Sequence, residues 1–221
     1  MVSSDGGYRV ADSVPNVEID SLTAGTNILL LGPQKPDMRS VAANIITIAP
    51  TDDEGAVWIA LDGEISWLIE EFNALSAIDH LSVIQAGNHE PIEDFAPEHY
   101  YGVKSPDRLT DLGMALIEYG DQTGSTFSGS RIVFDSVSTL LNHVEEQRVF
   151  EFITAFSGRI RVSNDLGIWL MNSQEHSPQT IATFRELFDI VIELPDEEES
   201  KRPRVEEDAG DTGDWVSKSA P

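Results

Sequence analysis

Short, continuously apolar segments alternate with segments of helical periodicity along most of this chain, and that alternation constrains the fold more than any other feature. Continuous hydrophobicity is typical of strands that are buried on both faces of a parallel sheet. Segments of strand length that are candidates for such a sheet lie at residues 27–32, 56–63, 81–87, 131–136, 167–173 and 189–194.

Helical periodicity fills the intervals between these predicted strands. In residues 64–75, apolar side chains recur at positions 65, 68, 69, 72 and 75, which lie on one face of a helix. Further helices are predicted at residues 36–49, 106–122 and 137–162 (the last as one helix or two), with a short one within 180–188. The alternation predicts an α/β fold with a mostly parallel central sheet and helices on both faces.

Three regions of the chain differ in composition. Residues 1–16 are polar and contain glycine, which predicts a flexible lead-in, and residues 17–195 form the predicted α/β domain. Within that domain, residues 88–104 are predicted as a polar and aromatic loop. Residues 196–221 are acidic, with Gly and Ser and no apolar pattern, which predicts a disordered tail in which Trp215 could anchor a partner.

The formal net charge of the chain is −25 at pH 7. Residues 193–221 carry ten acidic and four basic residues, a net of −6, so the remaining −19 belongs to the folded body. Such a surface repels itself unless salt shortens the screening length, to about 3 Å at 1 M. The charge therefore favours a protein of a high-salt cytoplasm, resembling those of haloarchaea; the alternative is an acidic regulatory protein of an ordinary cell.

The composition also excludes several classes of function. Direct binding to nucleic acid or to an anionic membrane is not expected, because no basic stripe is present to neutralise phosphates. The chain has no cysteine, so disulfides and thiolate metal sites are excluded. No apolar run approaches the length of a membrane helix, about 18 residues, and no signal-peptide core is present, so a cytoplasmic location is predicted.

The segment LLLGPQKPDMRSV, residues 29–41, begins like a phosphate-binding loop, with an apolar strand followed by a glycine turn and a helix. The signature G-x-x-x-x-G-K-[ST] should then continue from Gly32. Counting along the chain places Asp37 at the second glycine, Met38 at the lysine and Arg39 at the hydroxyl residue. The sequence therefore predicts a degenerate phosphate loop.

Polar residues follow several predicted strands, namely Gly32, Asp62, Asp135 and Asn172. In a parallel sheet the ligand crevice lies beyond the carboxyl ends of the strands, so these positions carry the candidate chemistry. Asp135 stands out, because the strand of RIVFDSVSTLL ends in Asp-Ser, as a magnesium-organising carboxylate requires. The alternative is that this Asp caps the following helix.

The order of these motifs resembles the RecA-like ATPases, and within them the KaiC-like, RadA-like and gas-vesicle-regulator-like proteins of archaea. VFDSVSTLL matches the second nucleotide motif of that group, and the closing strand FDIVIEL is a further match. The resemblance covers residues 17–195 and implies a RecA-like P-loop fold. The chain also looks like a haloarchaeal subgroup in which the first motif, Walker A, is degenerate.

The resemblance also implies roles for individual residues. Asp135 matches the magnesium-side carboxylate, and Glu64 lies near the water-activating glutamate, although a helix-start acid is the alternative. Asn172, Ser173 and Gln174 lie where a residue that senses the γ-phosphate is expected, or they are simply a polar strand end. The implied cofactor-binding residues are Gly32, Gln34, Lys35, Arg39, Ser40 and Asn172.

The departures in the first motif weaken any ATP site. Losing the charge-assisted lysine bond removes about 1.5–3 kcal/mol. A carboxylate at Asp37 about 4 Å from a phosphate charge costs about 4 kcal/mol at an effective dielectric of 20, before salt screening. Pro36 also removes one N–H from the anion cradle. Together these effects lower the affinity by about 10²- to 10⁵-fold, so ATP and Mg²⁺ are expected to bind weakly if they bind.

Two functions remain open at this stage. The first is a non-catalytic or weakly nucleotide-binding regulatory or scaffold protein that acts through a protein partner or a homo-oligomer. The second is an atypical ATPase that uses Asp135 and Glu64, with Lys35 or Arg39 replacing the loop lysine and Ser40 as a displaced magnesium ligand. His80, His89 and His99 have no metal-ligand spacing, and His176 follows the strand that ends at Asn172.

Overall fold

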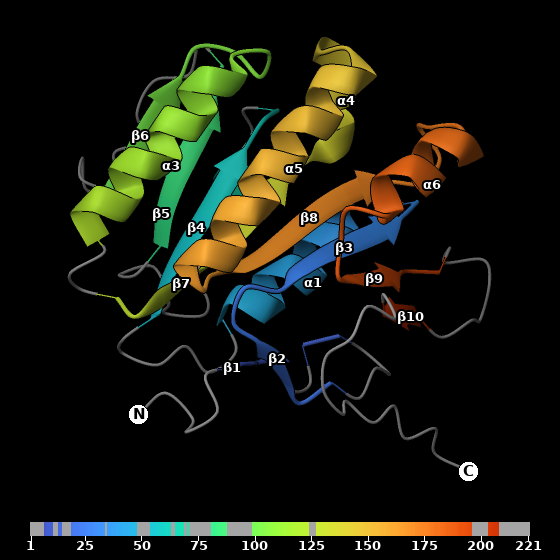
Figure 1. Cartoon of the computed structure of the whole chain (residues 1–221), viewed down its shortest axis with the longest axis horizontal. Coiled ribbons are helices and arrows are strands. Elements are labelled where there is room, and N and C mark those ends of the chain that lie inside the picture. The colour runs from blue at the N-terminus through green and yellow to red at the C-terminus, as the bar shows by residue number, and fades with distance from the viewer. Residues whose placement is uncertain are drawn as a thin grey trace.

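The structure is a computed structural model of the whole chain (Figure 1). It describes residues 7–10, 13–14, 19–33, 35–47, 54–62, 65–68, 70, 81–87, 99–123, 127–195 and 203–207, without the side chains of Lys35 and Pro36. Its strands are β1 (Gly7–Arg9), β2 (Ser21–Thr23), β3 (Asn27–Gly32), β4 (Glu54–Ala60), β5 (Leu81–Ala86), β6 (Tyr100–Val103), β7 (Gly129–Asp135), β8 (Leu166–Asn172), β9 (Ile190–Glu193) and β10 (Arg204–Glu207). Its helices are α1 (Lys35–Thr47), α3 (Leu109–Thr123), α4 (Val137–His143), α5 (Glu146–Ser163) and α6 (Pro178–Arg185).

One large sheet forms the centre of the molecule, with the strand order β10-β9-β3-β8-β7-β4-β5-β6. All neighbouring pairs are parallel except β10 with β9. A second sheet consists of β1 and β2, paired antiparallel. The large sheet confirms the predicted α/β fold with a mostly parallel centre.

Helices cover both faces of the large sheet (Figure 1). Alternate residues of β3 show why: Ile28 and Leu30 belong to one apolar core together with α1, β1 and β2. Leu29 and Leu31 point to the other face and belong to a second core, formed with α3, α4, α5 and α6. The continuous hydrophobicity of the predicted strands thus reflects burial on both faces.

The helix boundaries follow from local chemistry. Ser136 caps α4 by accepting a hydrogen bond from the Thr139 backbone N–H, and Ser177 caps α6 in the same way, ahead of Pro178. The predicted helical stretch 137–162 is two helices, because Val144 adopts an extended conformation between α4 and α5. None of the described helices is long and apolar enough to span a membrane.

Three predictions about loops and termini need correction. The predicted loop 88–104 contains β6, whose Tyr101 is buried and donates a hydrogen bond to Gln122. The predicted lead-in contains β1, which pairs with β2. The predicted disordered tail contains β10, which pairs with β9 and is tied to it by Arg185, a donor to both Glu193 and Glu206. Trp215, His80 and His89 lie outside the described residues.

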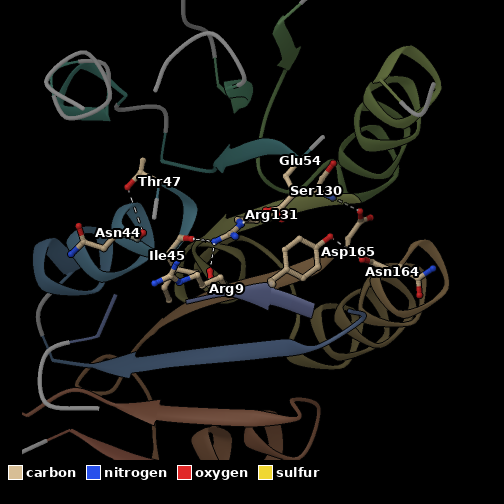
Figure 2. Close-up of polar contacts among 10 residues, drawn as sticks. Arg9, Asn44, Ile45, Thr47, Glu54, Ser130, Arg131, Asn164 and Asp165 are labelled. Atoms are coloured by element: carbon tan, nitrogen blue, oxygen red, sulfur yellow. Dashed lines mark hydrogen bonds and ion pairs between the residues drawn. The ribbon is translucent and has the colours of Figure 1, made fainter. Parts of the chain in front are cut away.

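A buried ion pair within the large sheet also connects β1 and α1 to that sheet (Figure 2). Arg131 on β7 donates from Nε to Glu54 of β4 at 2.8 Å, and both side chains are buried. Its Nη1 donates to the carbonyl oxygens of Arg9 in β1, at 3.0 Å, and Ile45 in α1, at 2.6 Å. The guanidinium also lies 5.4 Å from the centre of the Tyr8 ring. One side chain therefore connects β1, α1, β4 and β7.

Substituting Arg131→Met should lower the free energy of unfolding by about 3–5 kcal/mol, because it leaves the Glu54 carboxylate buried without its guanidinium. The double variant Arg131→Met/Glu54→Leu should recover most of this loss, since apolar side chains of similar volume replace the whole pair. Denaturant unfolding measures both values. A single variant as stable as the wild type would contradict this role for Arg131.

Candidate functional site

The carboxyl ends of four adjacent strands bring the predicted polar residues to one edge of the sheet. The strands β3, β8, β7 and β4 are neighbours in that order. Two backbone hydrogen bonds tie the loops beyond them, from Ser173 N to the Gly32 carbonyl at 2.9 Å and from Leu61 N to the Asp135 carbonyl at 2.8 Å. Gly32, Asp62, Asp135 and Asn172 therefore surround one region of the molecule, as predicted.

The loop after β3 is short. Strand β3 ends at Gly32 and helix α1 begins at Lys35, so only Pro33 and Gln34 lie between them. The phosphate-loop signature has four residues between its glycines, and the backbone N–H groups of that loop cradle the phosphates. Here Asp37, at the second glycine position, already lies in the first turn of α1. Helix α1 therefore begins within the stretch that forms the loop in the signature.

Met38, at the position of the signature lysine, is a core residue. Its side chain is fully buried and belongs to the apolar core under α1. It packs on the backbone of Gly32, where an added Cβ atom would lie 3.3 Å from the Met38 Cγ atom and 3.2 Å from the Cβ atom of Leu194. A lysine here would have to bury its ammonium group or leave the core.

Arg39 lies between two carboxylates. Its Nε donates to Asp135 Oδ2 at 2.6 Å and its Nη2 donates to Asp62 Oδ2 at 2.7 Å. The Asp135 side chain is fully buried, that of Arg39 is 12% exposed and that of Asp62 is 28% exposed. The guanidinium also lies 4.8 Å from the centre of the Trp67 ring, a favourable cation–π geometry. The positive charge of Arg39 thus balances one of the two negative charges at these strand ends.

Among the remaining residues of the predicted cofactor-binding set near α1, the structure describes the side chain of Ser40. Ser40 is exposed on α1. Gln34, Glu64 and the side chain of Lys35 lie outside the described residues. Asp135 is not the N-cap of helix α4, because its neighbour Ser136 provides that cap.

At the end of β8, Asn172 is part of a hydrogen-bonded cluster. Its side-chain oxygen accepts from Gln174 N at 2.9 Å, and its Nδ2 donates to Glu175 at 2.8 Å. The hydroxyl of Ser138 accepts from the Asn172 backbone N–H at 2.9 Å and lies 2.8 Å from His176 Nε2. Burial lowers the pKa of His176, although nearby acidic residues oppose this. These contacts fix the polar loop after β8 against α4.

The sequence indicated some of these residues and missed others. Asp62, Asp135 and Asn172 were visible as polar strand ends. Nothing in the sequence signalled that Arg39 pairs with Asp135, which is 96 positions away, or that Trp67 and Ser138 take part. Among the residues that the structure describes, no group of three or more His, Cys, Asp or Glu side chains could hold a metal ion.

Comparisons with known proteins agree with this architecture. The family of unknown function DUF7504 matches residues 25–194. The structure is similar to the crystal structure of the KaiC-like protein PH0186 from the hyperthermophilic archaeon Pyrococcus horikoshii OT3, with a TM-score of 0.59 and 15% identity over 89% of this chain and 86% of that chain. A likeness at this identity shows the fold, and it confirms the predicted RecA-like fold. The search of curated proteins finds no match.

Substituting Arg39→Met should lower the free energy of unfolding by about 3 kcal/mol, because the buried Asp135 carboxylate loses its guanidinium. The loss should persist in about 3 M KCl, since buried pairs are screened less than exposed ones. The matched control is Arg108→Met, which removes an exposed ion pair with Asp111 and should leave the unfolding midpoint unchanged. Equal effects of the two substitutions would contradict a special role for Arg39.

Proposed function

We propose that this protein, which belongs to the family of unknown function DUF7504, is a RecA-like regulatory or scaffold protein that acts through protein–protein contacts and does not turn over ATP. The observation that carries the proposal is the pairing of Arg39 with Asp135 and Asp62. These are the carboxylates that a magnesium ion would need at this edge of the sheet.

Arg39 acts in this proposal as a built-in counter-ion. A magnesium ion would have to displace a group that is tethered to α1 and stacked on Trp67. It would also have to give up part of its hydration shell, which Mg²⁺ does reluctantly. Metal binding is therefore disfavoured even where the carboxylates are intact.

The turn after β3 supports the same conclusion for the phosphates. Pro33 and Gln34 alone separate β3 from α1, and the carboxylate of Asp37 lies in the first turn of the helix. Together with the buried Met38, this arrangement offers neither a long N–H cradle nor a lysine. We infer a degenerate Walker A motif.

The alternative, an atypical ATPase in which Arg39 replaces the loop lysine, requires Arg39 to leave both of its partners. That step would take the guanidinium away from the buried Asp135 carboxylate, which is unfavourable. An ATPase that relies on Lys35 avoids this step but still lacks a free magnesium carboxylate. The regulatory function is therefore the one that the geometry supports best.

The acidity of the chain supports a cytoplasm with high salt as the setting. Of the net charge of −25, −19 lies outside residues 193–221 and belongs to the folded body, so nucleic acid and anionic membranes are poor partners. A protein partner or a second copy of the chain fits this surface, once salt screens the repulsion. We propose a halophilic cytoplasmic protein of this kind.

Titration of the wild type with Mg-ATP in about 3 M KCl should give no calorimetric binding signal and no phosphate release. By contrast, the Arg39→Met variant should show a rise in unfolding midpoint with added Mg²⁺ that the wild type lacks, because the guanidinium no longer competes with the ion for Asp135 and Asp62. Thermal unfolding with and without MgCl₂ measures this difference.

The control for the titration is Asp135→Asn, which removes the carboxylate without changing the shape of the side chain. It should behave like the wild type towards Mg-ATP, and its state of assembly in sedimentation should not depend on nucleotide. If the wild type hydrolyses Mg-ATP and Asp135→Asn abolishes this activity, the protein is an ATPase and the proposal is wrong.

The unfolding midpoint of the wild type should rise as KCl is increased from about 0.1 M to about 3 M, because salt screens the repulsion among the acidic side chains. Differential scanning calorimetry at constant pH measures the midpoint. Sucrose at matched water activity is the control for general exclusion effects. A midpoint that is independent of KCl would argue for an acidic protein of an ordinary cytoplasm.

A further inference from the structure

A cavity lies at the edge of the sheet opposite to Asp135. It opens where β7 begins, between the last turns of α3 and α5, and its volume is about 290 Å³. Figure 1 shows that these two helix ends approach the same edge of the sheet. Small-molecule sites begin at about 300 Å³, so the cavity suits a ligand much smaller than a nucleotide.

The polar lining of the cavity carries two opposite charges that do not pair. Arg159, on α5, is half-buried and makes no hydrogen bond or ion pair with any residue that the structure describes. Asp165, just before β8, accepts one hydrogen bond, from the Ser130 backbone N–H to Oδ1 at 2.8 Å (Figure 2). Within the described ranges its second oxygen, Oδ2, accepts none. A ligand could therefore engage both groups.

Glycines keep space open for the polar side chains around the cavity. An added Cβ atom at Gly120, in the last turns of α3, would lie 2.8 Å from Arg159 Nη2. At Gly55 it would lie 2.3 Å from the Tyr119 hydroxyl, which itself is 2.8 Å from Ser130 Oγ. A glycine inside a helix lowers the stability of the helix. Gly120 therefore destabilises α3 slightly at the position where it leaves room for the Arg159 side chain.

The lining of the cavity offers groups for both charges of a ligand, since it contains Arg159, Asp165 and Asp121. The last carbonyls of α3 and α5 add partial negative charge. An ammonium group can bind the Asp165 carboxylate. A guanidinium binds a carboxylate through paired hydrogen bonds, which suits Arg159 to an anionic group of the ligand.

We propose that this cavity binds a small α-amino acid as its zwitterion, with Arg159 holding the carboxylate and Asp165 holding the ammonium group. The hydroxyls of Tyr119 and Ser130 supply further hydrogen-bonding groups. This site is separate from the crevice at Asp135 and does not depend on the function proposed for that crevice.

The proposal predicts that binding weakens in acid. Burial raises the pKa of Asp165 to about 6, although the Ser130 N–H and Arg159 oppose this rise. The other titratable groups near this carboxyl are Asp121 on the cavity wall and the two tyrosines, Tyr8 and Tyr119, whose pKa values are raised by burial so that both stay neutral. Below pH 6 the protonated Asp165 no longer attracts an ammonium group.

The test is thermal unfolding and calorimetry of the full chain with each standard L-α-amino acid, at about 10 mM, at pH 7.5 and pH 5. At least one amino acid should raise the midpoint at pH 7.5, with a several-fold weaker Kd at pH 5. The analogues of that amino acid that lack its carboxylate or its amino group should each have no effect; for serine these are ethanolamine and 3-hydroxypropionate. If no amino acid binds, or if either analogue binds as well as its parent amino acid does, the proposal is wrong.

Variants locate the site. Arg159→Gln and Asp165→Asn should each weaken binding by about 10- to 100-fold, because each removes one charge-assisted contact. Asn at position 165 keeps an oxygen for the Ser130 N–H, so folding should survive, and this variant should lose the pH dependence. The matched control is Arg148→Gln, an exposed arginine on α5 outside the cavity, which should bind as the wild type does. Unchanged binding in Arg159→Gln would overturn the assignment.

Discussion

The pairing of one arginine with two aspartates sets the character of the crevice. Asp135 is buried at the end of a central strand, and a buried carboxylate is tolerated only with a compensating charge. In this chain the compensation comes from Arg39, on the first helix after the central strand β3. The same contact fixes α1 against β7 and β4, so the position of the helix and the neutralisation of the crevice depend on one side chain.

The two ends of the central strands differ in the ligands that they can bind. At the carboxyl edge, a guanidinium and a buried methionine occupy the space where phosphate and metal chemistry would require room. At the opposite edge, glycines leave room, and the charged groups face a cavity. Function in doubly wound folds is usually sought at the carboxyl edge. In this protein Arg159 and Asp165, which line a cavity without pairing with each other, lie at the other one.

The sequence was sufficient for the fold because burial on both faces leaves a pattern within each strand. Residues 27–32 and 131–136 could be recognised without knowledge of any partner. The short strands β6 and β10 were missed, since their hydrophobicity is interrupted, as Tyr100, Gly102 and Glu206 illustrate. The candidate site could be predicted only as a set of strand ends. The Arg39 contact and the paired use of Arg159 and Asp165 depend on tertiary geometry, which no spacing in the sequence encodes.

The burial of Met38 against Gly32 has a consequence for any attempt to restore a phosphate loop. Met38→Lys alone would place an ammonium group in the apolar core. Arg39→Thr alone would remove the counter-ion of a buried aspartate. Each step is unfavourable without the other and without a longer turn after β3. The two substitutions are therefore expected to be strongly epistatic: each lowers stability when it is made alone, so a stepwise path to the signature passes through destabilised intermediates.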